Sequence, residues 1–241
     1  MNKGRLILNK TKKIIFCAHG SNSKLFIKEF ETFFFKASKY FKLQNCYKCF
    51  IEKNYPDIST CLSSLYPKNQ IINFVPILIF PGNHYLIDIK SEMKRYEKVH
   101  IHKTINLDEE VRKIFEEKIS QRIKSKRRIL ITACSKSNRK SVYNILEEYT
   151  KKLSKSLKCH CQFSIDNTEI NFVLKELINL SEKEKTELIL HPIFLFDGFL
   201  YQSIIDHFKK LNFQNITITN PFMREKEVLE FVLKKINHNL I

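Results

Sequence analysis

Two histidines each follow a short apolar run and lie next to a glycine. His19 comes after Ile14–Ala18, in "IIFCAHGS", and His84 comes after Phe74–Phe80, in "FVPILIFPGNH". The neutral imidazole binds first-row divalent metal ions and accepts protons near pH 7. Two such ligands leave coordination positions open, as a protein that hands its metal ion on requires. A closed four-ligand structural site would retain the ion.

The sequence around these histidines alternates strands with helices. In the first half we expect strands at 14–18, 45–52, 71–79 and 98–104, and helices at 22–41, 57–66, 84–96 and 108–123. In the second half we expect strands near 129–133, 159–165, 188–193 and 215–219. Because strands that alternate with helices pair in parallel, the sequence predicts an α/β fold. Each half is expected to form a parallel four-stranded sheet flanked by helices.

The two halves of the chain resemble each other. "KKIIFCAHGSNSK", from Lys12, matches "RRILITACSKSNR", from Arg127. "FVPILIFPGNHYLIDI" matches "LHPIFLFDGFLYQSII", and "EEVRKIFEEKI" matches "KEVLEFVLKKI", in the same order and at a nearly constant offset. Such internal similarity is typical of a duplication. We therefore predict two tandem domains, residues 1–124 and 125–241.

The copies differ at the positions where chemistry would occur. His19 aligns with Cys134, and His84 aligns with Leu200. In open parallel sheets, ligands bind at the carboxyl ends of the strands, where both histidines are expected. A single histidine after a strand is typical of a loop or a helix cap. A matched pair that the second copy lacks favours one active domain and one scaffold domain.

The charge of the chain bounds its partners. Lys and Arg number 42 against 25 Asp and Glu, which gives a net charge of +17. This excess favours an acidic partner, although a biased composition rich in Lys, Asn and Ile would produce it equally. The lysines are dispersed along the chain, which argues against a dedicated nucleic-acid-binding arm.

Cysteine usage and hydropathy bound the compartment. The seven cysteines are an odd number, and "MNKGRLILNKTKK" has no apolar segment of the kind found in a signal peptide. No apolar run approaches the roughly 18 residues of a membrane span. We expect a cytoplasmic protein with reduced thiols that does not associate with a membrane.

Other residues capable of metal chemistry are interpreted as structural. Cys46 and Cys49 have the spacing of a redox or zinc pair, but a strand would point them to opposite faces. Cys159-His160-Cys161 places both thiols on one strand face, and metal binding there is the lesser alternative. The pair His100 and His102 is expected at a half-exposed edge, with a secondary metal contact as the lesser alternative, and His191 is expected to be structural.

Several of these stretches resemble the class II sirohydrochlorin chelatases in their long, two-domain form. The resemblance rests on "AHGS" after the first strand, "CFIEKNYPDI" after the second and "FVPILIFPGNHYLIDI" after the third. The second half, with "LHPIFLFDGFLYQSI", is similar to the family's degenerate carboxy-terminal copy, in which an apolar residue replaces the histidine. The chain departs from the family pattern at Pro81 and Asn83, where small or apolar residues are more usual.

The resemblance implies two chelatase-like domains that insert Fe²⁺ or Co²⁺ into sirohydrochlorin, on the way to sirohaem or cobalamin. It gives His19 and His84 the roles of binding the metal ion and accepting the pyrrole protons, without an organic cofactor. Neutral imidazole suits both roles near pH 7. The substrate is a flat macrocycle ringed by carboxylates, which basic side chains would attract. We expect a monomer.

Further residues receive roles from the same resemblance. Glu52 corresponds to the family's acidic residue beside the cleft, as a third metal ligand, a proton relay or a solvated strand-end residue. Ser21 would bind a propionate of the substrate or cap the first helix. Gly20 and Gly82 would let the flat ligand approach the backbone, and Asp88 would cap or orient the helix that begins near His84.

Two other functions are consistent with the sequence. A tetrapyrrole- or metal-binding carrier would use the same histidines without turnover. A basic nucleic-acid-binding protein is indicated by net charge alone. Salt-sensitive DNA binding without affinity for a tetrapyrrole would identify the latter.

Overall fold

The chain forms two parallel sheets with helices on both faces. The structure is a computed structural model that describes residues 12–65, 70–164, 186–210, 213 and 215–241. The first sheet has the strand order β2-β1-β3-β4 and the second the order β6-β5-β7-β8, and all pairs are parallel. The predicted α/β class, with one four-stranded parallel sheet in each half, is therefore confirmed.

The elements of the first half follow the predicted sequence of strands and helices. The strands are β1 (Lys13–Ala18), β2 (Cys46–Phe50), β3 (Ile72–Pro76) and β4 (Val99–Ile101). The helices are α1 (Lys24–Phe41), α2 (Ile58–Leu65), α3 (Lys90–Met93) and α4 (Glu109–Ser120), with a π-helix η2 (His84–Ile89) and a 3₁₀ turn η1 (Leu43–Asn45). The predicted helix at 84–96 is thus a π-helix followed by a short α-helix. The predicted helix end at Tyr66 lies outside the described residues.

The second half repeats this arrangement. Its strands are β5 (Arg127–Ala133), β6 (His160–Ser164), β7 (Thr186–Pro192) and β8 (Asn215–Ile218). Its described helices are α5 (Lys140–Leu157), α7 (Phe199–Lys209) and α8 (Lys226–His238), with a 3₁₀ turn η3 (Phe222–Arg224). The predicted strand end at Ile165 lies outside the described residues.

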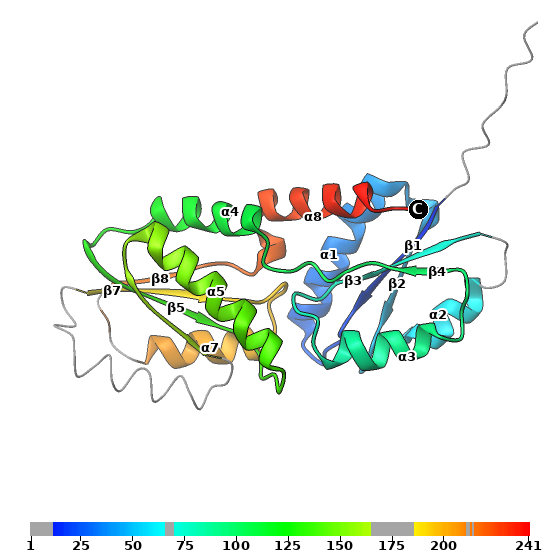
Figure 1. Cartoon of the computed structure of the whole chain (residues 1–241), viewed down its shortest axis with the longest axis horizontal. Helices are drawn as coiled ribbons and strands as arrows, with labels where there is room; N and C mark the ends of the chain where they lie inside the picture. Colours follow the sequence, from blue (N-terminus) through cyan, green and yellow to red (C-terminus); the bar gives the residue numbers. More distant parts are fainter. Residues whose placement is uncertain (1–11, 66–69, 165–185, 211–212, 214) are drawn as a thin grey trace, which may run out of the picture.

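The last helix of each half packs on the other half. Figure 1 shows α4 beside α5 over the second sheet, and α8 beside α1 over the first. Phe115 of α4 contacts the ring of His191 in β7, with centroids 4.4 Å apart. In return, Lys235 of α8 donates to the carbonyl of Ile105 at 2.9 Å. The predicted boundary after residue 124 therefore lies between the two sheets in the sequence. In space, the last helix of each half packs against the other half.

Burial of apolar side chains joins the halves into one core. A single cluster contains buried residues of α1, α4, α5 and α8 together with both sheets, among them Phe30, Phe115, Leu146 and Val232. The opposite faces of the two sheets have their own clusters, under α2 and α3 in the first half and under α7 in the second. Because burying one such phenylalanine contributes about 1.5–3 kcal/mol, the shared cluster holds the two sheets together.

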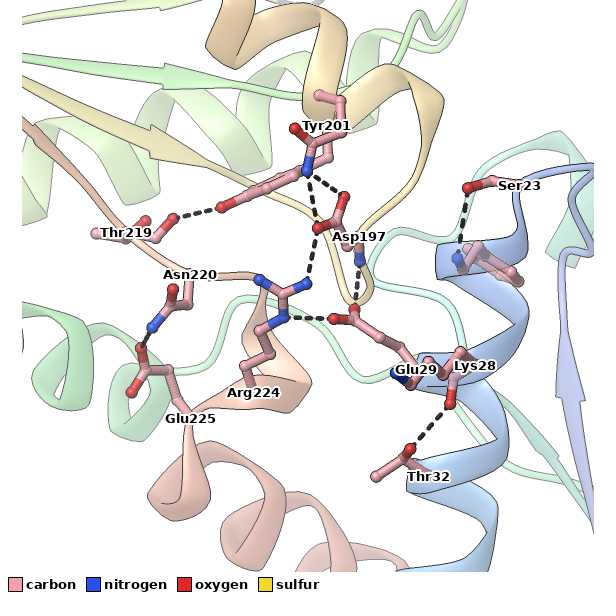
Figure 2. A network of polar contacts seen from close by, with 12 residues as sticks. Ser23, Lys28, Glu29, Thr32, Asp197, Tyr201, Thr219, Asn220, Arg224 and Glu225 are labelled. Atoms are coloured by element: carbon pink, nitrogen blue, oxygen red, sulfur yellow. Dashed lines mark hydrogen bonds and ion pairs between the residues drawn. The ribbon is translucent and has the colours of Figure 1, made fainter.

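Polar contacts reinforce this junction. Figure 2 shows Arg224 of η3 between Glu29 of α1 and Asp197 of the loop before α7. The Arg224 guanidinium donates to Asp197 Oδ2 at 2.7 Å and also binds Glu29. The backbone amide of Asp197 donates to Glu29 Oε2 at 2.5 Å. The network ties the amino-terminal end of α1 to the second half, next to the loop that follows β1.

Candidate functional site

His19 and His84 meet at the carboxyl end of the first sheet. Their Nε2 atoms are 2.8 Å apart, and the rings are nearly perpendicular, with centroids 4.3 Å apart. Two imidazole nitrogens that bind one metal ion at about 2.1 Å and a right angle are about 3 Å apart. The two nitrogens are therefore within hydrogen-bond distance of each other, and their separation is close to the one that a shared ion would require.

The loop after β1 positions His19 through a close backbone contact. Gly20 has φ +95°, and a Cβ there would lie 1.9 Å from the carbonyl oxygen of Glu52. The amide of Glu52 donates to the carbonyl of His19 at 3.0 Å, and the amide of Ser21 donates to Asn54 Oδ1 at 2.6 Å. The loop after β2 thus fixes the loop that carries His19, and only glycine fits at position 20 without strain.

The π-helix η2 positions His84. His84 Nδ1 donates to Asp88 Oδ2 at 2.7 Å, four residues along the same helical segment. With its proton on Nδ1, the imidazole presents the lone pair of Nε2 toward His19. Asp88 therefore binds the His84 side chain, a contact that was not predicted from the sequence, because Asp88 was expected to cap or orient the helix itself. π-Helical segments occur frequently at functional sites.

Glu52 lies beside the pair on the His19 side. Its Oε1 is 3.7 Å from His19 Nδ1 and 3.3 Å from Lys53 Nζ. Partial burial acts to raise the pKa of Glu52, but the hydrogen bond from Lys53 and the nearby charges of His19 and Lys53 lower it below its usual range. No group of three His, Cys, Asp or Glu side chains within the described residues has a geometry that holds a metal ion. Glu52 is therefore close to His19, and its role as a third ligand, a proton relay or a solvated strand-end residue stays a prediction.

The structure bears on the capping role expected of Ser21 but not on the ligand contact expected of Gly82. The side chain that caps α1 is Ser23, whose Oγ accepts from the amide of Phe26 at 3.4 Å. The expectation that Ser21 caps this helix is wrong, because Ser21 lies two residues before the cap and its Oγ accepts from the amide of Ser23 at 3.0 Å. A Cβ at Gly82 would meet open space, so its contact with a ligand stays a prediction.

The second half presents apolar residues where the first presents His84. Leu200, which aligns with His84, is 55% exposed, and its neighbour Phe199 is 67% exposed, at the start of α7. Cys134, which aligns with His19, is buried. Arg139, at the start of α5, donates from Nε to Asn83 Oδ1 at 2.5 Å and so links the second half to the loop that carries His84.

The residues interpreted as structural are mostly buried. Cys46 and Cys49 belong to different core clusters, which confirms that they point to opposite faces of β2. His191 is fully buried in β7, and this burial lowers its pKa to about 3. The expectation of a half-exposed edge is wrong for His102, because it is buried and Asn73 Oδ1 accepts from its Nε2 at 3.1 Å. Its pKa falls to about 4 because of burial and the nearby His100.

Sequence reasoning missed two residues that shape the site. Asn54 holds the amide of Ser21, and Arg139 binds Asn83 across the two halves. Asn54 lies in a loop whose path no periodicity reveals. Arg139 reaches the site only because the two halves pack together. It lies in the segment of the second half that matches the loop carrying His19, and this match could have identified it.

Comparison with known proteins identifies a family that the first half of the chain matches. Residues 13–122 match the model of the CbiX family, which confirms the resemblance carried by the sequence motifs. No curated protein sequence matches the chain. Within the described residues, no helix has the length and apolar character needed to cross a membrane.

Solved structures of chelatases share the fold. The sirohydrochlorin chelatase SirB from Bacillus subtilis subspecies spizizenii, in complex with cobalt, is 20% identical over 94% of each chain, with a TM-score of 0.73. SirB from Bacillus subtilis with Fe³⁺ is 20% identical over 94% of each chain, with a TM-score of 0.71. CbiX, the terminal enzyme for biosynthesis of sirohaem in denitrifying bacteria, is 14% identical over 95% of this chain and 100% of that one, with a TM-score of 0.64.

Proposed function

Since its amino-terminal half belongs to the CbiX family, we propose that this protein inserts a divalent metal ion, Fe²⁺ or Co²⁺, into sirohydrochlorin. The observation that carries the proposal is the 2.8 Å approach of the His19 and His84 Nε2 atoms at the carboxyl end of a parallel sheet. In this proposal the protein acts as a monomeric lyase in the cytoplasm, in sirohaem or cobalamin biosynthesis. It uses no organic cofactor, and the metal ion is a substrate.

The chemistry is an exchange of one ion for two protons. His19 and His84 hold the divalent ion through Nε2 and leave its remaining coordination positions free for pyrrole nitrogens. As the ion passes to the macrocycle, the two released imidazole nitrogens accept the two pyrrole protons. The charge of the site is then conserved, because two protons replace one divalent cation.

The carboxylates stabilise the protonated state of this pair. Asp88 accepts a hydrogen bond from His84 Nδ1, and Glu52 lies 3.7 Å from His19 Nδ1. A carboxylate behind an imidazole stabilises the imidazolium that forms during proton transfer. Glu52 is 43% exposed at its side chain, so it can also pass the proton from His19 to solvent.

Substrate binding is proposed to use both halves. Gly20 and Gly82 would admit the macrocycle close to the backbone, and Ser21 lies within this loop to bind a peripheral carboxylate. Phe199 and Leu200, exposed at the counterpart of the His84 position, would contact its apolar face. The net charge of +17 attracts an anionic substrate at long range.

Anaerobic insertion kinetics test the proposal. We expect catalytic change of the absorption spectrum of sirohydrochlorin with Fe²⁺ or Co²⁺, and loss of most activity in His19→Ala and in His84→Ala. Circular dichroism should show both variants folded, because the two side chains are 34% and 41% exposed. The ion turned over faster identifies the metal specificity.

Three results would decide against the proposal. Binding of one equivalent of sirohydrochlorin without turnover favours a carrier. Full activity in both histidine variants removes the two-histidine mechanism. Salt-sensitive DNA binding without tetrapyrrole affinity favours a nucleic-acid-binding protein.

A further inference from the structure

A cavity that includes neither histidine of the pair lies at the amino-terminal edge of the second sheet. It has a volume of about 950 Å³ and opens between the start of β5, the last turn of α5 and the start of β6. The described residues that line it are Lys126, Arg127, Arg128, Ile129, Ser154, Lys155, Lys158, Cys159, His160, Cys161 and Gln162. The proposed insertion chemistry uses none of them.

The charge of this cavity is of one sign. Five of the described lining residues are Lys or Arg, and none is Asp or Glu. Lys126, Lys155 and Lys158 make no ion pair in the part of the chain that the structure describes. Elsewhere, cations are commonly paired, as Arg112 is with both Glu109 and Glu116. A cluster of unpaired like charges destabilises the fold unless a counter-ion compensates it.

Arg128 provides an independent sign of a missing partner. It shares a strand face with Leu130, which packs in the core under α5. Its Nε is buried and has no hydrogen-bond partner among the residues that the structure describes. Burial raises the pKa of the neighbouring Cys159 thiol to about 11, and the charge of Arg128 opposes that rise. A buried guanidinium nitrogen without an acceptor from the chain is available to an acceptor that a ligand supplies.

Stabilisation of a helix end does not account for the cluster. Lys155 and Lys158 lie at the carboxy-terminal end of α5, where cations interact favourably with the helix carbonyls. Lys126, Arg127 and Arg128 come instead from the start of β5, which has no such requirement. Two separate elements thus bring positive charge to the same cavity.

We propose that this cavity binds a multiply charged oxyanion of small-molecule size, a polyphosphate or a polycarboxylate. Arg128 would supply charge-assisted hydrogen bonds from its planar guanidinium, and Lys126, Lys155 and Lys158 would neutralise the remaining charge. The same charged hydrogen-bond donors would recognise a polyphosphate and a polycarboxylate. The two ligands differ in whether phosphate or carboxylate groups carry the oxygens. The site is independent of the proposed insertion reaction.

Calorimetric titration with two probes tests the proposal. Tripolyphosphate represents the phosphate source, and uroporphyrin, a macrocycle ringed by carboxylates, represents the other. The test variant combines Lys126→Gln, Arg128→Gln and Lys155→Gln. We expect it to bind at least one probe about tenfold or more weakly than the native chain. The probe that loses affinity identifies the source.

The control removes the same charge elsewhere. It combines Lys36→Gln, Lys209→Gln and Lys234→Gln, three exposed residues on α1, α7 and α8. If attraction to a net charge of +17 caused the binding, both triple variants would lose affinity equally. Equal affinities of the two variants for both probes would overturn the proposal.

A measurement on the native chain gives a second, variant-free test. Cys159 and Cys161 are partly exposed and line the cavity, whereas Cys134 is buried. We expect the probe that binds to slow alkylation of Cys159 and Cys161 several-fold, as measured by peptide mass spectrometry. An unchanged alkylation rate at saturating probe would contradict binding in this cavity.

Discussion

Each histidine of the pair has a carboxylate on its Nδ1 side. Asp88 Oδ2 is 2.7 Å from Nδ1 of His84, and Glu52 Oε1 is 3.7 Å from Nδ1 of His19. A carboxylate that accepts from a metal-binding imidazole fixes its orientation and strengthens it as a ligand. At the scale of single residues, His84 and Asp88 therefore form an imidazole–carboxylate pair, whereas His19 Nδ1 donates to the carbonyl of Gly20 at 3.0 Å and has Glu52 nearby as a charge.

Replacing Asp88 should weaken the site without unfolding the chain. In Asp88→Asn the carboxylate that holds His84 Nδ1–H is lost, while the size of the side chain is kept. We expect Co²⁺ affinity to fall about tenfold or more, and the insertion rate to fall with it. The visible absorption bands of bound Co²⁺, recorded during a titration, measure the affinity directly.

The matched control is another exposed carboxylate paired four residues along a helix. Glu147 binds Lys151 of α5 at 2.6 Å, so Glu147→Gln breaks a similar pair away from the site. It should change neither Co²⁺ affinity nor insertion. Equal effects of the two substitutions would show that Asp88 acts only through local helix stability.

The pair of histidines was predictable from the sequence, but its supporting residues were only partly so. The carboxyl ends of parallel strands meet at one edge of a sheet, and this rule alone brings His19 to His84. The contact of Asp88 with His84 was not predicted, because Asp88 was expected to cap or orient the helix and not to bind its first side chain. Asn54 was missed because its contact depends on a loop conformation that has no repeating pattern.

At the scale of elements, the loop after β2 fixes the loop after β1. Gly20→Ala would place a Cβ against the Glu52 carbonyl oxygen and impose φ +95° on a residue with a side chain. We expect a loss of about 2 kcal/mol or more in the free energy of unfolding, measured by urea denaturation. Gly82→Ala is the control, since its Cβ meets open space, and its stability should change little. Equal stability of both variants would contradict the constraint at position 20.

The start of α7 is expected to hold the macrocycle without taking part in proton transfer. Phe199→Ser with Leu200→Ser removes two exposed apolar side chains at the counterpart of the His84 position. We expect KM for sirohydrochlorin to rise about thirtyfold, while Co²⁺ affinity is unchanged, because two lost apolar contacts of about 1 kcal/mol each weaken binding by about 2 kcal/mol in total. Steady-state kinetics measure the effect.

A second exposed apolar residue provides the comparison for α7. Phe35 of α1 is 55% exposed, so Phe35→Ser has a similar effect on surface polarity. Its position eleven residues into α1 lies away from the loop that carries His19. An unchanged KM in the α7 variant, or an equal rise in Phe35→Ser, would show that α7 does not contact the substrate.

At the scale of the whole molecule, the sequence repeat predicts two equivalent sheets but not where their closing helices lie. The segments that became α4 and α8 match each other in sequence and have similar apolar faces. The apolar face of such a helix does not show whether the helix packs on the sheet of its own half or on the sheet of the other half. The contact of Phe115 with His191 shows that α4 packs on the second sheet. This contact forms only in the assembled core.

His191 makes the stability of this assembled core depend on pH. It is fully buried between Phe115 and Phe222, with hydrogen bonds to Tyr149 and Thr219, and burial lowers its pKa to about 3. The unfolded chain binds a proton there near pH 6.5, whereas the folded chain does not. The stabilisation is therefore complete above about pH 6.5 and is lost as the pH falls from 6.5 toward 3.

His191→Val isolates this contribution, because valine is the residue at the aligned position of the first half. Between pH 7 and pH 5, the free energy of unfolding of the native chain should fall about 2 kcal/mol more than that of the variant. Urea denaturation at the two pH values measures both. The variant is less stable at pH 7, since it loses two buried hydrogen bonds, so the comparison concerns the pH dependence alone. His238→Gln, at an exposed histidine, should retain the native dependence. If the free energy of unfolding of His191→Val fell with pH as much as that of the native chain, groups other than His191 would cause the acid sensitivity.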